Sequence, residues 1–579
     1  MAEVPPLMKP AVLGAAVGDS ASATALGRLG VRVGAAPAKG VQQALRAALA
    51  DLRAGRREAA AAGALKALDI DERNGLAWHI LAICREKEGD FTVALQAYEQ
   101  ALALMPDEPE IANDLGRLAL KMNMAPIAER LFANYVSRRP DSAEGINNLA
   151  CAQRDLMRFD DAIDTLRSGL EAHPQSALLW NALGAVLTLQ GRMEPSLTFY
   201  DEALRLDPTA GAAYYNRSIA RLALGDAAGA LADLEAAARR MALAGQVAGM
   251  KVARAKALVA SGDLAAGWDA YEARLDPAYE DYVQFPTGLP DWDPQTPLSG
   301  RRLLLIGEQG LGDEVLFGHV LPDLIEAVGP DGALALAVDH RLTALFQRSF
   351  PSIEVGAHAS GRAGHTPVRT APFVENRLEA FDAFAPLGAP LRRFRRTAES
   401  FGRGAFLRAD PGRTEHWRAV LAALPGLKVG VLWKSLLMDA ERIRQFAPFA
   451  AWEPILAVGG VTFVNLQYGD SDAETAQTTA WGGGLWRPPG IDLKDDLDDL
   501  AALTCALDLT LGPANATTNI AGACGADVWL ISTPGAWPRL GLPDYPWYPN
   551  ARVFTPQTYA EWGPVMAQIA LALAARAGA

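Results

Sequence analysis

The segment WNALGAVLTLQGRMEPSLTFYDEALRLDP, residues 180–208, carries the pattern that decides the fold of the first half of the chain. If Trp180 is position 4 of a repeat, then Gly184, Tyr200 and Pro208 stand at positions 8, 24 and 32. The same small, aromatic and proline positions return every 34 residues between about residues 41 and 241, six times without a gap. A fixed period of this length indicates that one structural unit is stacked repeatedly against its own copies.

The other copies show which residue types the repeat positions require. Small residues allow two helices to approach closely, an aromatic residue fills the space beside them, and proline stops the second helix. The pattern resembles the tetratricopeptide repeat, in which each unit is a helix–turn–helix pair. Three further copies are formed by Trp78, Gly89, Ala94, Tyr98, Ala101 and Pro106, by Gly116, Ala128, Phe132, Tyr135 and Pro140, and by Ala150, Ala162, Leu166, Gly169 and Pro174.

Weaker copies stand at both ends of the array, as expected where a terminal repeat presents one face to water. The first begins at Val41, another begins at Gly211, and a last one, after a short insertion, contains Gly262 and Tyr271. An ordinary alanine-rich bundle would not keep one spacing through so many copies. We therefore predict an α-solenoid of about seven tetratricopeptide repeats over residues 41–275, with a groove that binds a protein or peptide.

Composition limits the class of protein. Half of the residues are hydrophobic, mean hydropathy is +0.05, and no stretch approaches the roughly 20 apolar residues of a membrane-spanning helix. The formal net charge of −13 argues against general nucleic-acid binding. The four cysteines lack metal-ligand spacing, and the first residues lack a secretion signal. These features predict a cytoplasmic protein that binds neither membrane nor nucleic acid, with residues 1–40 as a flexible leader.

The pattern changes after residues 276–300, a segment rich in Pro, Asp and aromatic residues that we interpret as a linker. From Arg301 onward short apolar runs alternate with helical patterns, which predicts an α/β fold with parallel sheets. The length suits two doubly wound halves, residues 301–420 and 421–579. The predicted strands are Arg302–Ile306, Ala333–Val338, Ile353–Val355, Val429–Trp433, Val461–Leu466, Leu507–Leu511 and Val528–Ile531.

Two of these strands lead into a glycine-rich turn and then a helix. The first turn is GEQGLGD, residues 307–313, and the second is GPANATTNIAG, residues 512–522. Ligands of doubly wound sheets lie at the carboxyl ends of the strands, and free N–H groups at a helix start attract phosphate. Neither turn matches the P-loop or the dinucleotide fingerprint. We predict that one turn from each half faces the other across a cleft that binds a nucleotide-activated substrate.

Residues 300–560 resemble the glycosyltransferase domain that follows tetratricopeptide arrays in many bacterial proteins. The similarity lies in EQGLGD at 308–313, KVGVLWK at 428–434, VNLQ at 464–467 and the strand–loop–helix–strand at 507–529. That domain is of GT-B type, distantly similar to the lipopolysaccharide heptosyltransferases and, in architecture, to O-GlcNAc transferase. NATTN at 515–519 and PGAWPR at 534–539 are similar to the flagellin-modifying, FlmG-like enzymes of this group. The resemblance implies a GT-B-like domain made of two Rossmann-like halves.

Asp313 is the first candidate for the catalytic residue. In the heptosyltransferase-like family the aspartate after this glycine is the proposed general base, and sugar transfer needs a carboxylate that takes the proton of the attacking hydroxyl. An aspartate at a helix start is equally suited to cap the helix, so both interpretations stay open. Glu308 is the second catalytic candidate, and we expect Gly310 and Gly312 to contact the nucleotide sugar.

The expected nucleotide-sugar site continues in the second half. Lys434 at a strand end and Arg444 beyond it would neutralise the departing phosphate, although both could be ordinary loop charges. Gln467 belongs to one of the similar segments. The family has Asp-Thr-Ser…His in the second turn, and this chain has amide and hydroxyl groups instead. The residues concerned, which either cap the helix or bind phosphate, are Asn515, Thr517, Thr518 and Asn519.

The resemblance implies an inverting, metal-independent protein O-glycosyltransferase. Its acceptor, flagellin, would bind to the repeats and receive a nonulosonic acid such as pseudaminic acid from a CMP donor on Ser or Thr hydroxyls. Asp291–Asp293 and Asp496–Asp498 match the Asp-x-Asp metal motif of another glycosyltransferase class, but a GT-B fold does not need it, and we assign no metal or cofactor. Two alternatives are an O-GlcNAc-type transferase that uses a UDP sugar and a catalytically inactive repeat scaffold.

Overall fold

The computed structural model describes residues 39–241, 244–364, 366–402, 404–435, 445–481 and 483–578 of the 579-residue chain. Most of the predicted leader, and Arg444 among the predicted site residues, lie outside the described residues.

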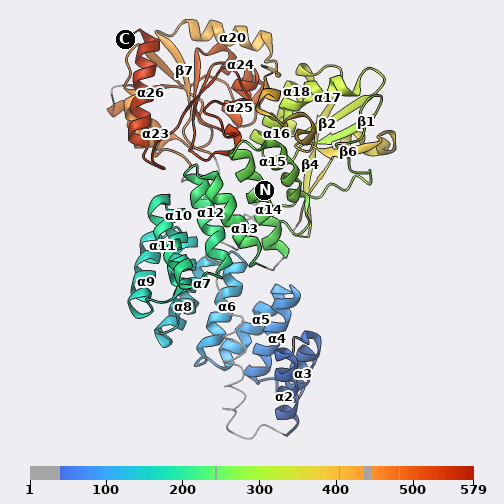
Figure 1. Ribbon diagram of the computed structural model, residues 1–579, viewed down its shortest axis with the longest axis vertical. Coiled ribbons are helices and arrows are strands. Elements are labelled where there is room, and N and C mark those ends of the chain that lie inside the picture. Colours follow the sequence, from blue (N-terminus) through green and yellow to red (C-terminus); the bar gives the residue numbers. More distant parts are fainter. Residues whose placement is uncertain are drawn as a thin grey trace. The chain divides into compact units, whose positions relative to one another are not determined.

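The first part of the chain is a series of helix pairs (Figure 1). The first helices of five successive pairs begin at residues 75, 109, 143, 177 and 211, each 34 residues after the one before. This spacing equals the sequence period and confirms the predicted α-solenoid of tetratricopeptide repeats. The pairs are α2 (Lys39–Arg53) with α3 (Arg57–Ile70), α4 (Gly75–Glu88) with α5 (Phe91–Leu104), α6 (Pro109–Lys121) with α7 (Ala125–Arg138), α8 (Ala143–Asp155) with α9 (Phe159–Ala172), α10 (Ala177–Leu189) with α11 (Met193–Leu206), α12 (Gly211–Ala223) with α13 (Ala227–Ala238), and α14 (Ala244–Ala260) with α15 (Leu264–Tyr271).

Close packing between small and aromatic residues explains why the repeat keeps them. A Cβ atom added to Gly116 would lie 2.6 Å from Phe132, and one added to Gly184 would lie 2.7 Å from Tyr200. Both rings are fully buried. Real Cβ atoms do not approach a ring so closely, so the ring fits only because the facing helix has a glycine at this position. The 34-residue pattern therefore records the contact between the two helices of each pair.

The α/β part begins with a four-stranded parallel sheet in the order β3-β2-β1-β6. Successive side chains of the central strand β1 point to opposite faces: Leu303 and Leu305 pack in one hydrophobic cluster, and Leu304 and Ile306 pack in another. Both faces are thus covered, as in a doubly wound fold. Its strands are β1 (Arg302–Ile306), β2 (Ala333–Val338), β3 (Glu354–Ala357) and β6 (Ala383–Pro386), and a separate hairpin is formed by β4 (Ala359–Ala363) and β5 (Thr366–Thr370).

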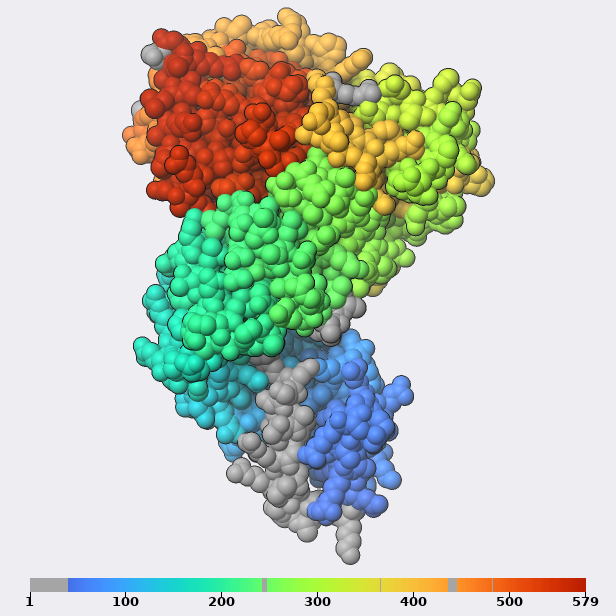
Figure 2. Space-filling model, viewed as in Figure 1, coloured from blue at the N-terminus to red at the C-terminus, as the bar shows by residue number. Residues whose placement is uncertain are grey.

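A second parallel sheet has six strands in the order β12-β11-β10-β7-β8-β9. One of its faces packs against α26 (Trp562–Ala577), and the other packs against α24 (Leu497–Ala506) and α25 (Ala516–Ala523). The space-filling view shows the C-terminal segment, in red, as one compact body (Figure 2). The strands are β7 (Leu427–Val431), β8 (Val461–Asn465), β9 (Leu485–Trp486), β10 (Leu509–Pro513), β11 (Val528–Ile531) and β12 (Ala551–Phe554). All seven predicted strands are present, and the α/β fold class is confirmed; β4, β5, β6, β9 and β12 were not predicted.

The boundary between the compact units differs from the predicted boundary at residue 275. The chain divides into one unit of residues up to 190 with 195–216, and a second unit of residues 191–194 with 217 onward. The last repeat helices therefore belong with the sheets. Trp268 of α15 is 2% exposed, packs in the same hydrophobic cluster as β1 and donates its indole N–H to the carbonyl of Arg395 at 2.8 Å. The helical period alone did not reveal this packing.

We predict that a fragment of residues 290–579 is unfolded or aggregates, whereas residues 211–579 fold. The shorter fragment lacks Trp268 and the buried Arg274, and losing either a buried Trp or one partner of a buried ion pair costs about 3–5 kcal/mol. Together these losses approach the whole stability of a typical domain, about 5–15 kcal/mol. Circular dichroism melting and gel filtration of both fragments measure this difference. Equal melting temperatures would show that the repeat helices are dispensable for the α/β fold.

Candidate functional site

The two glycine-rich turns contact each other. The first follows β1 and leads into α16 (Leu311–Phe317), and the second follows β10 and leads into α25. The Asn519 side-chain amide donates to the carbonyl of Gly312 at 3.0 Å, and a Cβ atom on Gly312 would lie 3.4 Å from the backbone nitrogen of Ala516. The two helix starts thus lie in van der Waals contact at Gly312. The structure brings together predicted site residues of the two halves that are about 200 residues apart in the sequence.

Asp313 lies in the first turn of α16 and remains partly exposed. Its carboxylate accepts one long hydrogen bond, 3.4 Å, from the backbone N–H of Gly310. Burial raises the pKa of Asp313 to about 6, with a smaller upward contribution from the negative charges of Glu308 and Glu314. The Gly310 N–H group and the positive charge of Lys256 act in the opposite direction. A carboxyl group with this pKa can accept a proton near neutral pH and release it again, as a general base must.

Three buried polar atoms beside this junction have no hydrogen-bond partner among the described residues. They are the side-chain nitrogen of Asn515, the side-chain oxygen of Asn519 and the hydroxyl oxygen of Tyr548. Tyr548 packs against α25, because a Cβ atom on Gly522 would lie 2.5 Å from its ring. Buried polar groups are nearly always satisfied, so these atoms indicate a place where a ligand or water binds. Asp313 also influences the pKa of Tyr548, so the carboxylate lies near the same groups.

The second turn is a helix cap as well as a candidate site. The Asn515 side chain accepts from the Thr518 backbone N–H at 3.2 Å, and the Thr518 hydroxyl accepts from the Asn515 backbone N–H at 2.9 Å. The Thr518 hydroxyl donates to the carbonyl of Pro513 at 2.9 Å. This reciprocal arrangement is a capping box, and the donation to Pro513 occupies the single donor hydrogen of the Thr518 hydroxyl. The structure therefore gives Thr518 a structural role, and Thr517 beside it is buried.

Lys434 and Gln467 meet at the carboxyl end of β7. The side-chain oxygen of Gln467 accepts from the backbone N–H groups of Trp433 and Lys434, both at 3.0 Å, and its nitrogen donates to the carbonyl of Tyr468. Gln467 thus holds the end of β7 in place, and its contact with the nucleotide stays a prediction. Lys434 pairs with Glu474 of α23 (Asp472–Ala480), whose carboxylate balances its charge.

Glu308 has structural contacts, and its catalytic role stays a prediction. Both of its carboxylate oxygens bind Arg274, at 2.7 and 2.9 Å, and one also accepts from the backbone N–H of Gly388 at 2.7 Å. The Arg274 and Glu308 side chains are each 3% exposed. Since Arg274 lies in the 3-10 turn Glu272–Leu275 after α15, this ion pair ties the last repeat to the first glycine-rich turn. Both oxygens of the Glu308 carboxylate therefore have a structural partner in Arg274.

A buried polar cluster, which the sequence did not predict, supports the first glycine-rich turn. Glu314 accepts from His358 at 2.9 Å, from Arg369 at 3.1 Å and from the backbone N–H of Asp339 at 2.8 Å. Arg369 also donates to the carbonyls of Gly307 and Gln309. The cluster joins the helix after β1 to the residues that follow β2 and β3 and to a residue of β5. Because these residues are far apart in the sequence and follow no motif, no sequence signal indicated them.

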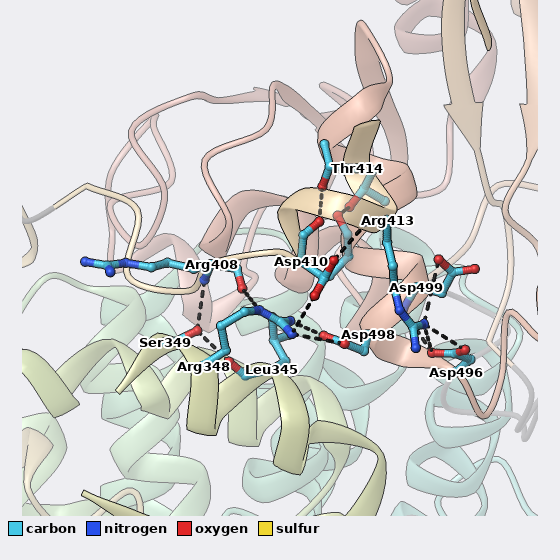
Figure 3. A network of polar contacts seen from close by, with 12 residues as sticks. Leu345, Arg348, Ser349, Arg408, Asp410, Arg413, Thr414, Asp496, Asp498 and Asp499 are labelled. Carbon is cyan, nitrogen blue, oxygen red and sulfur yellow. Dashed lines mark hydrogen bonds and ion pairs between the residues drawn. The ribbon is translucent and has the colours of Figure 1, made fainter. Parts of the chain in front are cut away.

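The aspartates of the second Asp-x-Asp sequence bind arginines (Figure 3). Asp498 pairs with Arg348 of α18 (Thr343–Ser349), and Asp496 pairs with Arg413 of α20 (Pro411–Ala422) at 3.0 Å. Arg348 also donates to the carbonyl of Arg408 at 2.9 Å. These contacts join helices of the two halves. The acidic run therefore has a structural partner for each of these two carboxylates, and it contains no group of ligands suited to a metal within the described residues.

Buried asparagines connect successive repeats, which the sequence analysis also missed. The Asn148 side chain donates to Asn113 at 3.0 Å, and the Asn216 side chain donates to Asn181 at 3.0 Å. The two residues of each pair are 35 positions apart, which is one repeat and one residue. An asparagine that recurs at the repeat period was the sequence signal from which these contacts could have been predicted. Because these side chains are buried, the contacts hold neighbouring helices together.

Known proteins provide a separate comparison. Tetratricopeptide repeat models match residues 85–150 and 147–211. The peroxisomal targeting signal receptor of Candida albicans is 30% identical over 171 residues, which cover 28% of each chain. Among solved structures, a tetratricopeptide repeat protein from Parabacteroides merdae has 16% identity and a TM-score of 0.36, over 41% of this chain and 93% of that one.

One relative extends over nearly the whole chain. The protein FlbA of Caulobacter vibrioides is 50% identical over 569 residues, which cover 97% of this chain and 95% of FlbA. The identity therefore includes the repeats and both sheets. Within the described residues, no helix has the length and apolar character needed to span a membrane. The chain belongs to the family of the Caulobacter FlbA protein.

Proposed function

We propose that this protein is a glycosyltransferase that modifies a protein acceptor, with Asp313 as general base. The observation that carries the proposal is the carboxyl group with a pKa of about 6 at the point where the two glycine-rich turns meet. Asp313 would take the proton of a Ser or Thr hydroxyl as its oxygen attacks the anomeric carbon. The bond between that carbon and the phosphate oxygen breaks, and the nucleotide leaves. Attack opposite to the leaving group inverts the configuration.

The donor side of the proposal rests on the second half. Lys434 follows β7, and the N-terminus of α25 follows β10; these strands are neighbours in the sheet, so both positive groups lie at the same edge. A departing phosphate would compete with Glu474 for Lys434 and gain the charge stabilisation that transfer requires. The resemblance to flagellin-modifying enzymes supports a CMP-activated nonulosonic acid such as pseudaminic acid as the donor.

The repeats supply the acceptor side. Tetratricopeptide arrays bind proteins, and repeated stacking provides an extended surface for a polypeptide. The resemblance supports flagellin as the acceptor. Binding on the repeats would raise the concentration of acceptor hydroxyls near Asp313, which accelerates transfer without any change in the chemistry.

The test uses the full-length chain with flagellin and a CMP-activated nonulosonic acid, and intact-mass spectrometry of flagellin measures transfer. We expect a mass increase of one or more sugar residues. Transfer from a UDP sugar alone would establish the O-GlcNAc-type alternative. If flagellin binds to the chain but gains no mass with any nucleotide sugar, the protein is a scaffold and the proposed activity is wrong.

Replacing Lys434 with alanine should weaken CMP binding about 10- to 100-fold, because a hydrogen bond to a charged group contributes about 1.5–3 kcal/mol. Lys428 is the matched control, since it lies at the opposite end of the same strand. Isothermal titration with CMP measures both variants, and Lys428→Ala should bind as the unaltered chain does. An equal affinity of Lys434→Ala would remove Lys434 from the site.

A further inference from the structure

A small cavity lies between the repeat helices and the carboxyl edge of the second sheet. Its volume is about 250 Å³. The repeat side is formed by the turns around Gly225 and Ala260, and the sheet side by the loop Pro534–Pro543 after β11. This loop is held tightly against the repeats, because a Cβ atom on Gly535 would lie 1.5 Å from the carbonyl oxygen of Leu222. The cavity is therefore a fixed feature of this compact unit.

Arg539 is the charged residue that lines this cavity. One of its terminal nitrogens donates to the carbonyl of Pro534 at 3.3 Å and to the hydroxyl of Thr555 at 3.2 Å. Both partners are neutral. The charge of Asp544 favours the protonated guanidinium, but the two groups form no ion pair within the described residues. A partly buried cation without a bound anion is costly, since its charge is neither fully hydrated nor neutralised.

The Nε–Nη2 edge of the Arg539 guanidinium makes no hydrogen bond among the described residues. Its Nε atom is buried and has no hydrogen-bond partner among the described residues, and the hydrogen bonds of Arg539 to Pro534 and Thr555 come from Nη1. Nε and Nη2 together form the planar pair of donors that binds two oxygens of one carboxylate or phosphate. Burial lowers the pKa of Arg539, because its surroundings disfavour the charged form of the guanidinium.

We infer that this cavity binds a two-oxygen anionic group of the substrate, held by Nε and Nη2 of Arg539. The cavity is smaller than the roughly 300–1,000 Å³ of sites that enclose a whole ligand, so it suits one group of a larger molecule. On the basis of the proposed function, the substrate is either an acidic sugar whose carboxylate enters the cavity or a nucleotide whose phosphate enters it. The carboxylate and the phosphate each present two oxygen atoms that can accept from the guanidinium.

The test compares three probes on the full chain by ligand-detected NMR titration: N-acetylneuraminic acid, its methyl ester and inorganic phosphate. If the carboxylate is the bound group, the acid binds, the ester binds at least tenfold more weakly, and Arg539→Gln abolishes the difference. If the bound group is a phosphate, phosphate binds and Arg539→Gln weakens it at least tenfold, while acid and ester do not differ. The inference is wrong if Arg539→Gln changes the binding of no probe.

Two further variants test whether anion binding depends on the paired donors of Arg539. Arg539→Lys keeps the charge but lacks the paired donors, so it should recover less than a third of the lost affinity. Arg552→Gln alters an exposed arginine of the neighbouring strand β12 and should change nothing. Melting temperatures confirm that the variants are folded. The failure of this inference can be told apart from the failure of the proposed function. If anions bind through Arg539 but no sugar is transferred, only the proposed activity is contradicted. If sugar is transferred and the donor KM of Arg539→Gln is unchanged, only the anion site at Arg539 is contradicted.

Discussion

Replacing Asp313 with asparagine should lower the rate of sugar transfer by about 100- to 10,000-fold, the usual contribution of a general base. Asparagine has nearly the same shape but cannot take a proton from the acceptor hydroxyl. A base acts in the transition state, so the affinities for nucleotide and acceptor should change little. Initial rates of flagellin modification, together with CMP titration, measure the two effects. Retention of more than a tenth of the rate would leave Asp313 as a helix cap.

The pH dependence gives an independent check on the same residue. A base must be deprotonated, and the pKa of Asp313 is raised to about 6. We therefore expect kcat/KM to fall tenfold for each pH unit below about 6 and to level off above it. The residual activity of Asp313→Asn should lack this step. A profile without a step between pH 5 and 7 would contradict Asp313 as the base.

Stability should respond in the opposite direction to activity. Because the folded pKa of Asp313 is raised above its ordinary value of 3.8, the group favours the folded state at low pH, and this contribution is lost as pH rises through about 6. The asparagine variant has no charge to bury. Its stability relative to the unaltered chain should therefore increase by roughly 1–3 kcal/mol between pH 4 and 7.5. A residue that only caps the helix would instead show a loss of stability that does not depend on pH in this way.

Replacing Arg274 with methionine should destabilise the α/β unit by about 3–5 kcal/mol, because it leaves the buried carboxylate of Glu308 without its partner. This ion pair joins the end of the repeats to the first glycine-rich turn, so the turn should lose its position as well. Calorimetry of the full chain measures the transition of the unit, and transfer rates measure the site. A change below about 1 kcal/mol would mean that the pair is already compensated by other contacts.

The double variant Arg274→Met with Glu308→Gln supplies the control. A neutral glutamine can still accept from the Gly388 N–H group, and no buried charge is left unpaired. Most of the lost stability should return. Transfer activity should return with it, since Glu308 has a structural role. If the double variant is stable but inactive, Glu308 is catalytic and the assignment of the base to Asp313 is wrong.

The sequence by itself determined the repeats and the class of the second half, because both depend on local periodicity. Positions such as those of Gly184 and Tyr200 recur every 34 residues because they contact each other within one helix pair. The apolar run of β1 indicates a strand that is buried on both faces. It also identified both glycine-rich turns, since a turn from strand to helix at a strand end is a local feature. The edge strand β12 was missed because its half-exposed residues alternate too weakly.

Only the tertiary structure decided which residues meet. It placed Gly312 against Asn519, paired Glu308 with Arg274, and joined α14 and α15 to the sheets instead of to a separate array. No period or motif specifies which atoms of these residues meet, since each contact arises from packing between segments that are distant in the chain. For the same reason the sequence left Asp313 undecided between cap and base: a helix start is visible locally, but the burial that raises its pKa comes from the whole fold.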